Sequence, residues 1–381
     1  MKSEKQPVQP VTSEPFLSRY LNSKGISLGL PISGTFELTA RCNFNCRMCY
    51  VHLQNSAELI PRELTADQLL SLASDARDMG LIYLLLTGGE PFIREDFPYI
   101  YTELVKMGLV ISINTNASLY NEEIRALFAK YPPSRINVTL YGGSEETYRS
   151  LCGNPSFEKV TANLRSMKED GLQVRLNVSL TPYNVGDMEE IDRISRDMEL
   201  QVKTSAYMYP PVRVTGEIGT NCARFTSCEA GSALSDWYKI HDPDDLFKAR
   251  AKHILERKDA GVTDNCADVE QEGVRCRAGR SSFWLTWDGR LLPCGTMDIE
   301  ASYPLRDGFA KAWDEVRERV AAIRLPMECS VCPDRMNCGV CASICKCEGG
   351  AFDKKPEYMC EMTKAFRGRM AEITKETENG Q

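Results

Sequence analysis

The 381-residue sequence has only three histidines, His52, His241 and His253, and none of them falls in a motif. Catalysis that depends on a histidine acid or base is therefore not indicated. An excess of basic residues is also missing, because the formal net charge is −7 at pH 7. This charge argues against a nucleic-acid partner, since binding to the phosphate backbone requires a basic footprint.

Long apolar runs are absent as well. The longest one, around residues 81–86, is far shorter than the roughly 20 residues that a membrane-spanning helix needs. The charged N-terminus is not followed by the apolar segment of a secretion signal. Hydrophobic residues make up 43% of the chain and charged residues 26%, which is typical of a globular protein. These features predict a cytoplasmic protein without a membrane partner.

Cysteine, in contrast, is abundant, with 16 residues. Because disulfides do not persist in a reducing cytosol, metal ligation is the better interpretation. Three cysteines lie within residues 42–49 and ten lie within residues 266–360, which predicts two metal-bearing regions. The scattered cysteines are interpreted as buried structural residues, with redox or hydrogen-donating thiols as the alternative. They are Cys152, Cys222 and Cys228.

Strand-like and helix-like segments alternate along the first half of the chain. Strands are expected at 35–40, 82–86, 110–114, 135–140, 174–180 and 202–207, and helices at 66–80, 95–106, 121–131, 157–170 and 185–198. Six such repeats indicate a parallel sheet covered by helices. We predict an α/β fold, a partial (β/α)6 TIM-like barrel, whose reactive residues follow the C-terminal ends of the strands.

The predicted organisation has five parts. They are an N-terminal extension at 1–34, the barrel at 35–215, a helical connector at 216–265, a cysteine-rich domain at 266–361 and a C-terminal helix at 362–381. Within the extension we expect a disordered start, a short helix from Glu14 and a turn-rich segment at 25–34.

The first cysteine group reads Cys42-Asn-Phe-Asn-Cys46-Arg-Met-Cys49 and follows the first expected strand. A [4Fe-4S] cluster normally takes four thiolates, so three of them leave one iron open to a small-molecule ligand. A zinc site is the alternative, but it requires a fourth cysteine or histidine nearby. His52 is the only candidate for that position.

A second motif, Thr87-Gly88-Gly89-Glu90-Pro91, follows the second expected strand. Together with the cysteine group and Tyr50, it closely resembles the signature of the radical S-adenosylmethionine (SAM) superfamily. In that family the glycine-rich loop binds the amino group of SAM, because glycine lets backbone carbonyls approach closely and Glu90 can pair with an ammonium. The resemblance also implies that SAM is cleaved to methionine and a 5′-deoxyadenosyl radical, which abstracts hydrogen from a substrate.

The same resemblance implies further contacts to SAM from polar residues at the ends of later strands. Those residues are Asn114, Asn116, Thr139, Asn177 and Ser179. Polar strand ends exposed to water are the alternative interpretation. Relatives often carry an arginine for the SAM carboxylate after the fourth strand, where this chain has Arg149, and its place need not be the same.

The C-terminal cysteines are similar to the SPASM extension of radical SAM enzymes, which carries two auxiliary [4Fe-4S] clusters. Residues 287–290, Trp-Asp-Gly-Arg, are expected to form the turn of a β-hairpin that brings two thiols together. The resemblance implies Cys276, Cys294, Cys341 and Cys266 as ligands of the first auxiliary cluster, and Cys329, Cys332, Cys338 and Cys360 as ligands of the second.

The spacing of these cysteines departs from the commoner SPASM pattern, so Cys345 competes with Cys341 as a ligand and Cys347 has no firm role. A zinc ribbon built from Cys-x2-Cys pairs is the alternative to two clusters.

Enzymes with this layout mostly modify peptides, so the resemblance implies peptide maturation, by cross-linking or oxidation, with flavodoxin or ferredoxin as the electron donor. Only 34 residues precede the first expected strand, and chains below about 40 residues seldom fold alone. Recognition of a leader peptide is therefore expected from the barrel or from a separate protein.

Three alternatives to peptide maturation stay open. One is anaerobic sulfatase maturation, against which Gly295 counts, because such enzymes have an aspartate after the auxiliary-cluster cysteine that here is Cys294. Another is radical oxidation of a small molecule. The last is a non-catalytic zinc-binding module.

Overall fold

The computed structural model describes residues 16–51, 57–211, 223–256, 272–297 and 299–379. Its centre is an eight-stranded sheet in the order β6-β5-β4-β3-β2-β1-β7-β8. The strands are β1 (Ser33–Glu37), β2 (Tyr83–Thr87), β3 (Val110–Thr115), β4 (Arg135–Thr139), β5 (Val174–Ser179), β6 (Gln201–Ser205), β7 (Ser282–Leu285) and β8 (Leu291–Leu292). All pairs from β6 to β7 are parallel, which confirms the predicted α/β fold with a partial TIM-like barrel.

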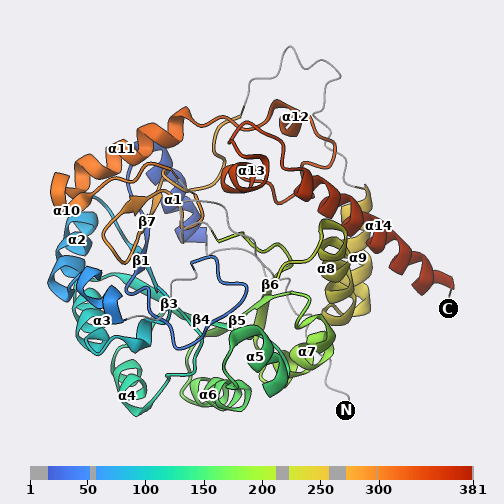
Figure 1. The fold of residues 1–381 in the computed structure, drawn as a ribbon, viewed down its shortest axis with the longest axis horizontal. Coiled ribbons are helices and arrows are strands. Elements are labelled where there is room, and N and C mark those ends of the chain that lie inside the picture. Colours follow the sequence, from blue (N-terminus) through green and yellow to red (C-terminus); the bar gives the residue numbers. More distant parts are fainter. Residues whose placement is uncertain (1–15, 52–56, 212–222, 257–271, 298, 380–381) are drawn as a thin grey trace.

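Helices surround the sheet. They are α1 (Phe16–Leu28), α2 (Ala66–Asp78), α3 (Phe97–Lys106), α4 (Glu122–Lys130), α5 (Glu145–Cys152), α6 (Phe157–Glu169), α7 (Met188–Asp197), α8 (Ser227–His241), α9 (Asp244–Glu256), α10 (Pro304–Asp307), α11 (Phe309–Ala322), α12 (Met327–Ser330), α13 (Ala342–Gly349) and α14 (Glu357–Asn379). Short 3-10 helices lie at Ala57–Arg62, Pro91–Ile93 and Val185–Asp187. Helices α2, α3, α4, α6 and α7 follow one another around the outside of the strands, and α5 lies between α6 and α7 (Figure 1).

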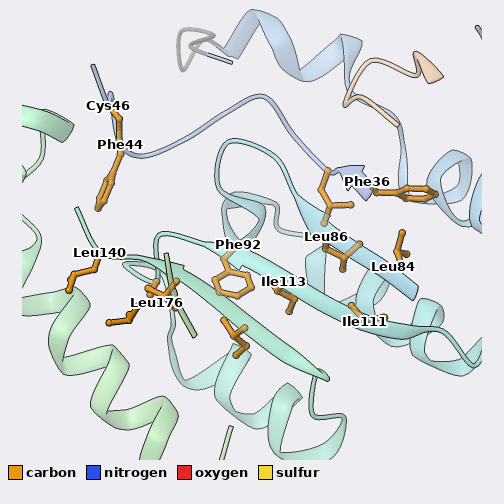
Figure 2. Close-up of a cluster of buried hydrophobic side chains, with 14 of the residues drawn as sticks. Phe36, Phe44, Cys46, Leu84, Leu86, Phe92, Ile111, Ile113, Leu140 and Leu176 are labelled. Atoms are coloured by element: carbon orange, nitrogen blue, oxygen red, sulfur yellow. The ribbon is translucent and has the colours of Figure 1, made fainter. Parts of the chain in front are cut away.

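The hydrophobic core lies between the strands and these helices. Register pairs Phe36 with Leu86 and Ile113 with Ile136, and all four side chains are almost fully buried. Leu86 and Ile113 gather there with Phe92 from the loop after β2 (Figure 2). Because side chains alternate between the faces of a strand, the neighbouring residues point away from the helices, toward the inside of the barrel.

Two local expectations differ from the structure. The segment at 25–34 was expected to be turn-rich, but α1 continues to Leu28 and ends only before Gly29, whose φ of +72° suits glycine. The stretch after β4 forms α5, a helix that was not predicted; Ser144 caps its start and Gly153, with φ +66°, ends it. A helix this short carries too little periodicity to stand out in the sequence.

The cysteine-rich region is joined to the barrel by a shared sheet. Strand β7 pairs in parallel with β1, and β7 and β8 form an antiparallel hairpin, so the expected turn at 287–290 is confirmed. Trp313 of α11 donates a hydrogen bond from Nε1 to the carbonyl of Gly29 at 2.8 Å. Within the ranges listed above, no helix is long and apolar enough to cross a membrane.

Candidate active site and metal centres

The three cysteines of the first motif lie in the loop that follows β1. Backbone hydrogen bonds fix this loop against the end of α5, from Asn45 N to the Cys152 carbonyl and from Arg47 N to the Leu151 carbonyl, both at 2.9 Å. Cys46 is buried, whereas Cys42 and Cys49 are partly exposed. The unpredicted helix α5 therefore holds the loop that carries the first cysteine group.

Cys42 has two hydrogen-bond donors at its sulfur. The backbone N of Phe44 lies 3.4 Å from Sγ, and Nδ2 of Asn116 lies 3.8 Å from it. Burial nevertheless raises the pKa of the Cys42 thiol to about 12. A thiolate at this position therefore needs a nearby cation, which an iron-sulfur cluster supplies.

All cysteines in the described ranges are free thiols, as expected for metal ligands. No three cysteine, histidine, aspartate or glutamate side chains in these ranges are arranged to hold one metal ion. A [4Fe-4S] cluster distributes its thiolates over separate irons, so it does not require ligands that converge on one ion. His52 lies outside the described residues.

The glycine-rich motif lies directly against the cysteine-bearing segment. Gly89 N donates to the carbonyl of Thr39 and Glu90 N donates to the carbonyl of Arg41, both at 2.9 Å. A Cβ on Gly89 would lie 2.2 Å from the Arg41 carbonyl oxygen, and one on Gly88 would lie 2.4 Å from that of Thr39. Both glycines are required because any side chain would push the two loops apart.

The side chain of Glu90 is held by several hydrogen bonds. Its side chain is fully buried, with 0% of its surface exposed, and accepts hydrogen bonds from Thr115 Oγ1, Asn116 N and Phe92 N at 2.7, 2.8 and 3.2 Å. Burial raises the pKa of this carboxyl to about 7, against the opposing effect of these donors. Glu90 thus joins the loops after β2 and β3, and its pairing with the SAM ammonium stays a prediction.

The other candidate SAM contacts are spread over neighbouring strands. Asn116 donates from Nδ2 to Asn43 Oδ1 at 2.9 Å as well as to Cys42, so it touches the cysteine segment directly. Asn114 accepts a hydrogen bond from Asn137 at 2.8 Å. Thr139 and Asn177 are register partners on β4 and β5, and Ser179 is two residues further along β5.

Arg149 does not face this group. It lies on α5, its side chain is 58% exposed, and it pairs with Glu146 on the same helix. This position gives no support to a role for Arg149 in binding the SAM carboxylate.

In the C-terminal region, the hairpin brings Cys276 and Cys294 close together. The pKa of the Cys276 thiol is raised by burial of the sulfur, although the residue as a whole is exposed, and then by negative charge at Cys294 and Cys341. Tyr209 Oη lies 3.6 Å from Cys341 Sγ. The three expected ligands of the first auxiliary cluster are therefore neighbours, and Cys266 lies outside the described residues.

The second set of cysteines also lies together. Burial and then negative charge at Cys360, Cys338 and Cys332 raise the pKa of Cys329 to about 11. Cys345 is fully buried, and its thiol interacts with one member of each set, since burial and then negative charge at Cys329 and Cys341 raise its pKa to about 12. This position leaves the competition between Cys341 and Cys345 open.

Sequence reasoning missed two residues around the first cysteine group. The pKa of Cys46 is raised first by a hydrogen bond with the Cys152 thiol and then by burial, so Cys152 lies beside the cysteine loop. Arg94 is buried and donates from Nη1 to the carbonyls of Leu38 and Leu64, at 2.7 and 2.9 Å. In the sequence, only the position of Arg94, three residues after Pro91, could have indicated that it lies near this site.

Comparison with known proteins agrees with this arrangement. The family model described as "Radical SAM superfamily" matches residues 36–195 of this chain. The chain is 30% identical over 275 residues to a probable GTP 3′,8-cyclase of Pyrobaculum aerophilum, covering 68% of this chain and 82% of the relative. It is 22% identical over 339 residues to the AdoMet-dependent heme synthase of Methanosarcina barkeri, covering 85% of this chain and 94% of that protein.

Among solved structures, SuiB of Streptococcus suis bound to its precursor peptide SuiA matches with a TM-score of 0.64 at 15% identity, over 94% of this chain and 83% of SuiB. This likeness shows a common fold that includes the C-terminal region. The motifs, the fold and the relatives lead to one conclusion: the chain belongs to the radical SAM superfamily, whose enzymes use a [4Fe-4S] cluster and SAM.

Proposed function

We propose that this enzyme modifies a peptide, by abstracting a hydrogen atom and forming a cross-link or an oxidised residue. The observation that supports this proposal is the match to SuiB over 94% of the chain, in a structure bound to a precursor peptide. A match confined to the barrel would carry less weight, because barrels of this kind host many reactions. Here the likeness extends to the cysteine-rich region.

In this proposal Cys42, Cys46 and Cys49 hold the SAM-binding cluster. A bound cluster would supply the electron for reductive cleavage of SAM, and with it the radical chemistry needed to abstract hydrogen from the substrate. The chain contributes positioning: Asn116 donates to Cys42 Sγ, and Gly88 and Gly89 allow the SAM-binding loop to lie against the cysteine segment. Burial around Cys46 keeps water away from the cluster.

The auxiliary clusters and the partners complete the proposal. Cys276, Cys294 and Cys341, with Cys266, hold the first auxiliary cluster, and Cys345 is the alternative to Cys341. Cys329, Cys332, Cys338 and Cys360 hold the second. A flavodoxin or ferredoxin supplies the electrons, and the barrel or a separate protein recognises the leader peptide.

The test is an anaerobic assay. Reconstituted enzyme is incubated with SAM, a reductant and short peptides encoded beside its gene, and 5′-deoxyadenosine and peptide mass are followed together. We expect a peptide that loses two hydrogens with matching formation of 5′-deoxyadenosine, and fragment ions then locate the new bond. Cleavage of SAM without any change in the peptides would overturn the peptide proposal and leave the superfamily assignment intact.

Small-molecule radical chemistry is the second candidate. It is favoured by the AdoMet-dependent heme synthase, which covers 85% of this chain, and by the GTP 3′,8-cyclase. The same assay with tetrapyrroles and GTP in place of peptides separates the two candidates. Turnover of either compound coupled to 5′-deoxyadenosine would replace the peptide proposal.

Sulfatase maturation fits less well for a structural reason. A Cβ on Gly295 would lie 2.7 Å from the ring of Trp284, so the position after Cys294 has no room for an aspartate. An acidic base in that place is therefore incompatible with the packing of β7.

A further inference from the structure

Three basic residues lie on the inner face of the sheet, away from the helices. Arg135 begins β4, Arg175 lies on β5 and Lys203 lies on β6. Register pairs Asn137 with Arg175 and Asn177 with Lys203. Residues two apart on a strand share a face, so all three basic side chains lie on one face with these two asparagines. The opposite face of the same strands is apolar and packs against the helices.

The three cations influence one another. Arg175 is half-buried, whereas Arg135 and Lys203 are exposed as whole residues. The pKa of Lys203 is nevertheless lowered by partial desolvation of its amine and then by the charges of Arg175 and Arg135, and the pKa of Arg175 is lowered by burial and then by Arg135. Throughout the described ranges, none of the three forms an ion pair with a carboxylate. Like charges at such proximity repel, so an anion between them would be stabilising.

Hydrogen-bonding atoms without partners lie beside these cations. Nε of Arg175 and the Oδ1 atoms of Asn137 and Asn177 are buried and have no hydrogen-bond partner in the described structure. Buried polar atoms are nearly always paired, with protein, water or a ligand. Of these three atoms, Arg175 Nε is a donor that an anion can accept from, whereas the two amide oxygens are acceptors and require a hydroxyl or N–H donor from the same ligand.

We propose that Arg135, Arg175 and Lys203 form an anion-binding site inside the barrel that holds a carboxylate or phosphate group of the substrate. Arg135 and Arg175 lie near the N-terminal ends of their strands, whereas the first cysteine group follows the C-terminal end of β1. A substrate anchored at its anionic group would thus extend toward the end of the barrel where SAM binds. The inference rests on the proposed function only in assigning the anion to the substrate.

The test uses anaerobically reconstituted holoenzyme and measures the binding of three probes by calorimetry. The probes are inorganic phosphate, a short glutamate-containing peptide and its glutamine counterpart. The variants Arg175→Gln and Lys203→Gln remove one cation each, and the control Arg193→Gln removes an exposed arginine of α7 that pairs with Glu190 and Asp197. Cluster absorbance and circular dichroism verify that each variant is folded and loaded.

We expect the wild type to bind phosphate or the glutamate peptide and to bind the glutamine peptide at least about tenfold more weakly. Arg175→Gln and Lys203→Gln should weaken anion binding by at least about tenfold, and Arg193→Gln by less than about twofold. Preference for the glutamate peptide identifies a carboxylate substrate, and preference for phosphate identifies a phosphorylated one. Equal anion affinity in the wild type and both inner-face variants would overturn the site.

The result can be separated from that of the peptide assay. If anion binding depends on Arg175 and Lys203 but no peptide is modified, the site stands and the peptide proposal fails. If both inner-face variants modify the peptide at the wild-type rate and KM, the peptide proposal stands and the anion site is wrong.

Discussion

Cys46 and Cys329 are both candidate cluster ligands, but the chain holds them in different ways. Around Cys46, backbone hydrogen bonds connect the loop after β1 to α5, and the large core of the barrel lies beneath it (Figure 2). Cys329 lies in α12, a helix of four residues. A small hydrophobic cluster packs between α11 and α13 nearby, and the large core reaches this region only at its edge, where Cys338 and Cys341 pack against it. A region with so small a core needs other cross-links, and metal binding can provide them.

This contrast predicts that the two candidate metal centres depend on iron to different degrees. The barrel positions its thiols through regular structure that does not require the metal. The cysteine-rich region has few regular hydrogen bonds between Cys329 and Cys341, so its conformation should depend on bound clusters.

Replacing Cys46 by alanine should reduce SAM cleavage by at least about 1000-fold, because a cluster with two thiolates is not retained at the barrel. The measurement is the rate of 5′-deoxyadenosine formation under reducing, anaerobic conditions. Cys228→Ala is the matched control, since Cys228 is exposed on α8, and should change the rate by less than about twofold. Substantial cleavage by the Cys46→Ala enzyme would show that this loop does not hold the SAM-binding cluster.

Removing iron with a chelator should unfold the cysteine-rich region locally while the barrel keeps its structure. Amide hydrogen exchange measures both regions in one experiment. We expect protection in 329–349 to fall by on the order of 100-fold, and protection in β2, β3 and β4 to stay within about threefold of the iron-loaded value. Equal loss of protection in both regions would show that the barrel depends on iron as much as the cysteine-rich region does.

Gly89→Ala should lower the free energy of unfolding by about 1 to 3 kcal/mol, because the new Cβ would lie 2.2 Å from the Arg41 carbonyl oxygen. It should also weaken SAM binding, since the glycine-rich loop must move. Urea unfolding and SAM titration measure the two effects. Gly186→Ala is the control: nothing lies within 4 Å of its Cβ, and the unfolding free energy should change by less than about 0.5 kcal/mol.

Glu90 should make stability depend on pH. Its pKa is about 7 in the folded protein against 4.5 for an ordinary glutamate, so between these values the folded state keeps a proton that the unfolded state has lost. The free energy of unfolding of the wild type, relative to Glu90→Gln, should therefore fall as pH rises from 4.5 to about 7, by at most roughly 1.4 kcal/mol per pH unit. Urea unfolding at pH 5, 6, 7 and 8 tests this, and a rise across this range would contradict it.

The sequence by itself determined the superfamily, the barrel and the positions of the cysteine groups. Cysteine spacing and the glycine pair are local, and strand and helix periodicities are carried by consecutive residues, so neither requires knowledge of distant contacts. The hairpin turn at 287–290 was found for the same reason. These features can therefore be predicted without knowing how the rest of the chain folds.

Only the tertiary structure decided which distant residues meet. Cys152 lies beside Cys46 because α5 packs on the cysteine loop. Glu90 is fully buried where Thr115, the last residue of β3, and Asn116, which follows it, donate hydrogen bonds to its carboxylate. Arg135, Arg175 and Lys203 share a face because register aligns β4, β5 and β6. Such contacts depend on strand register and on packing between elements far apart in the chain, and local patterns do not encode either of them.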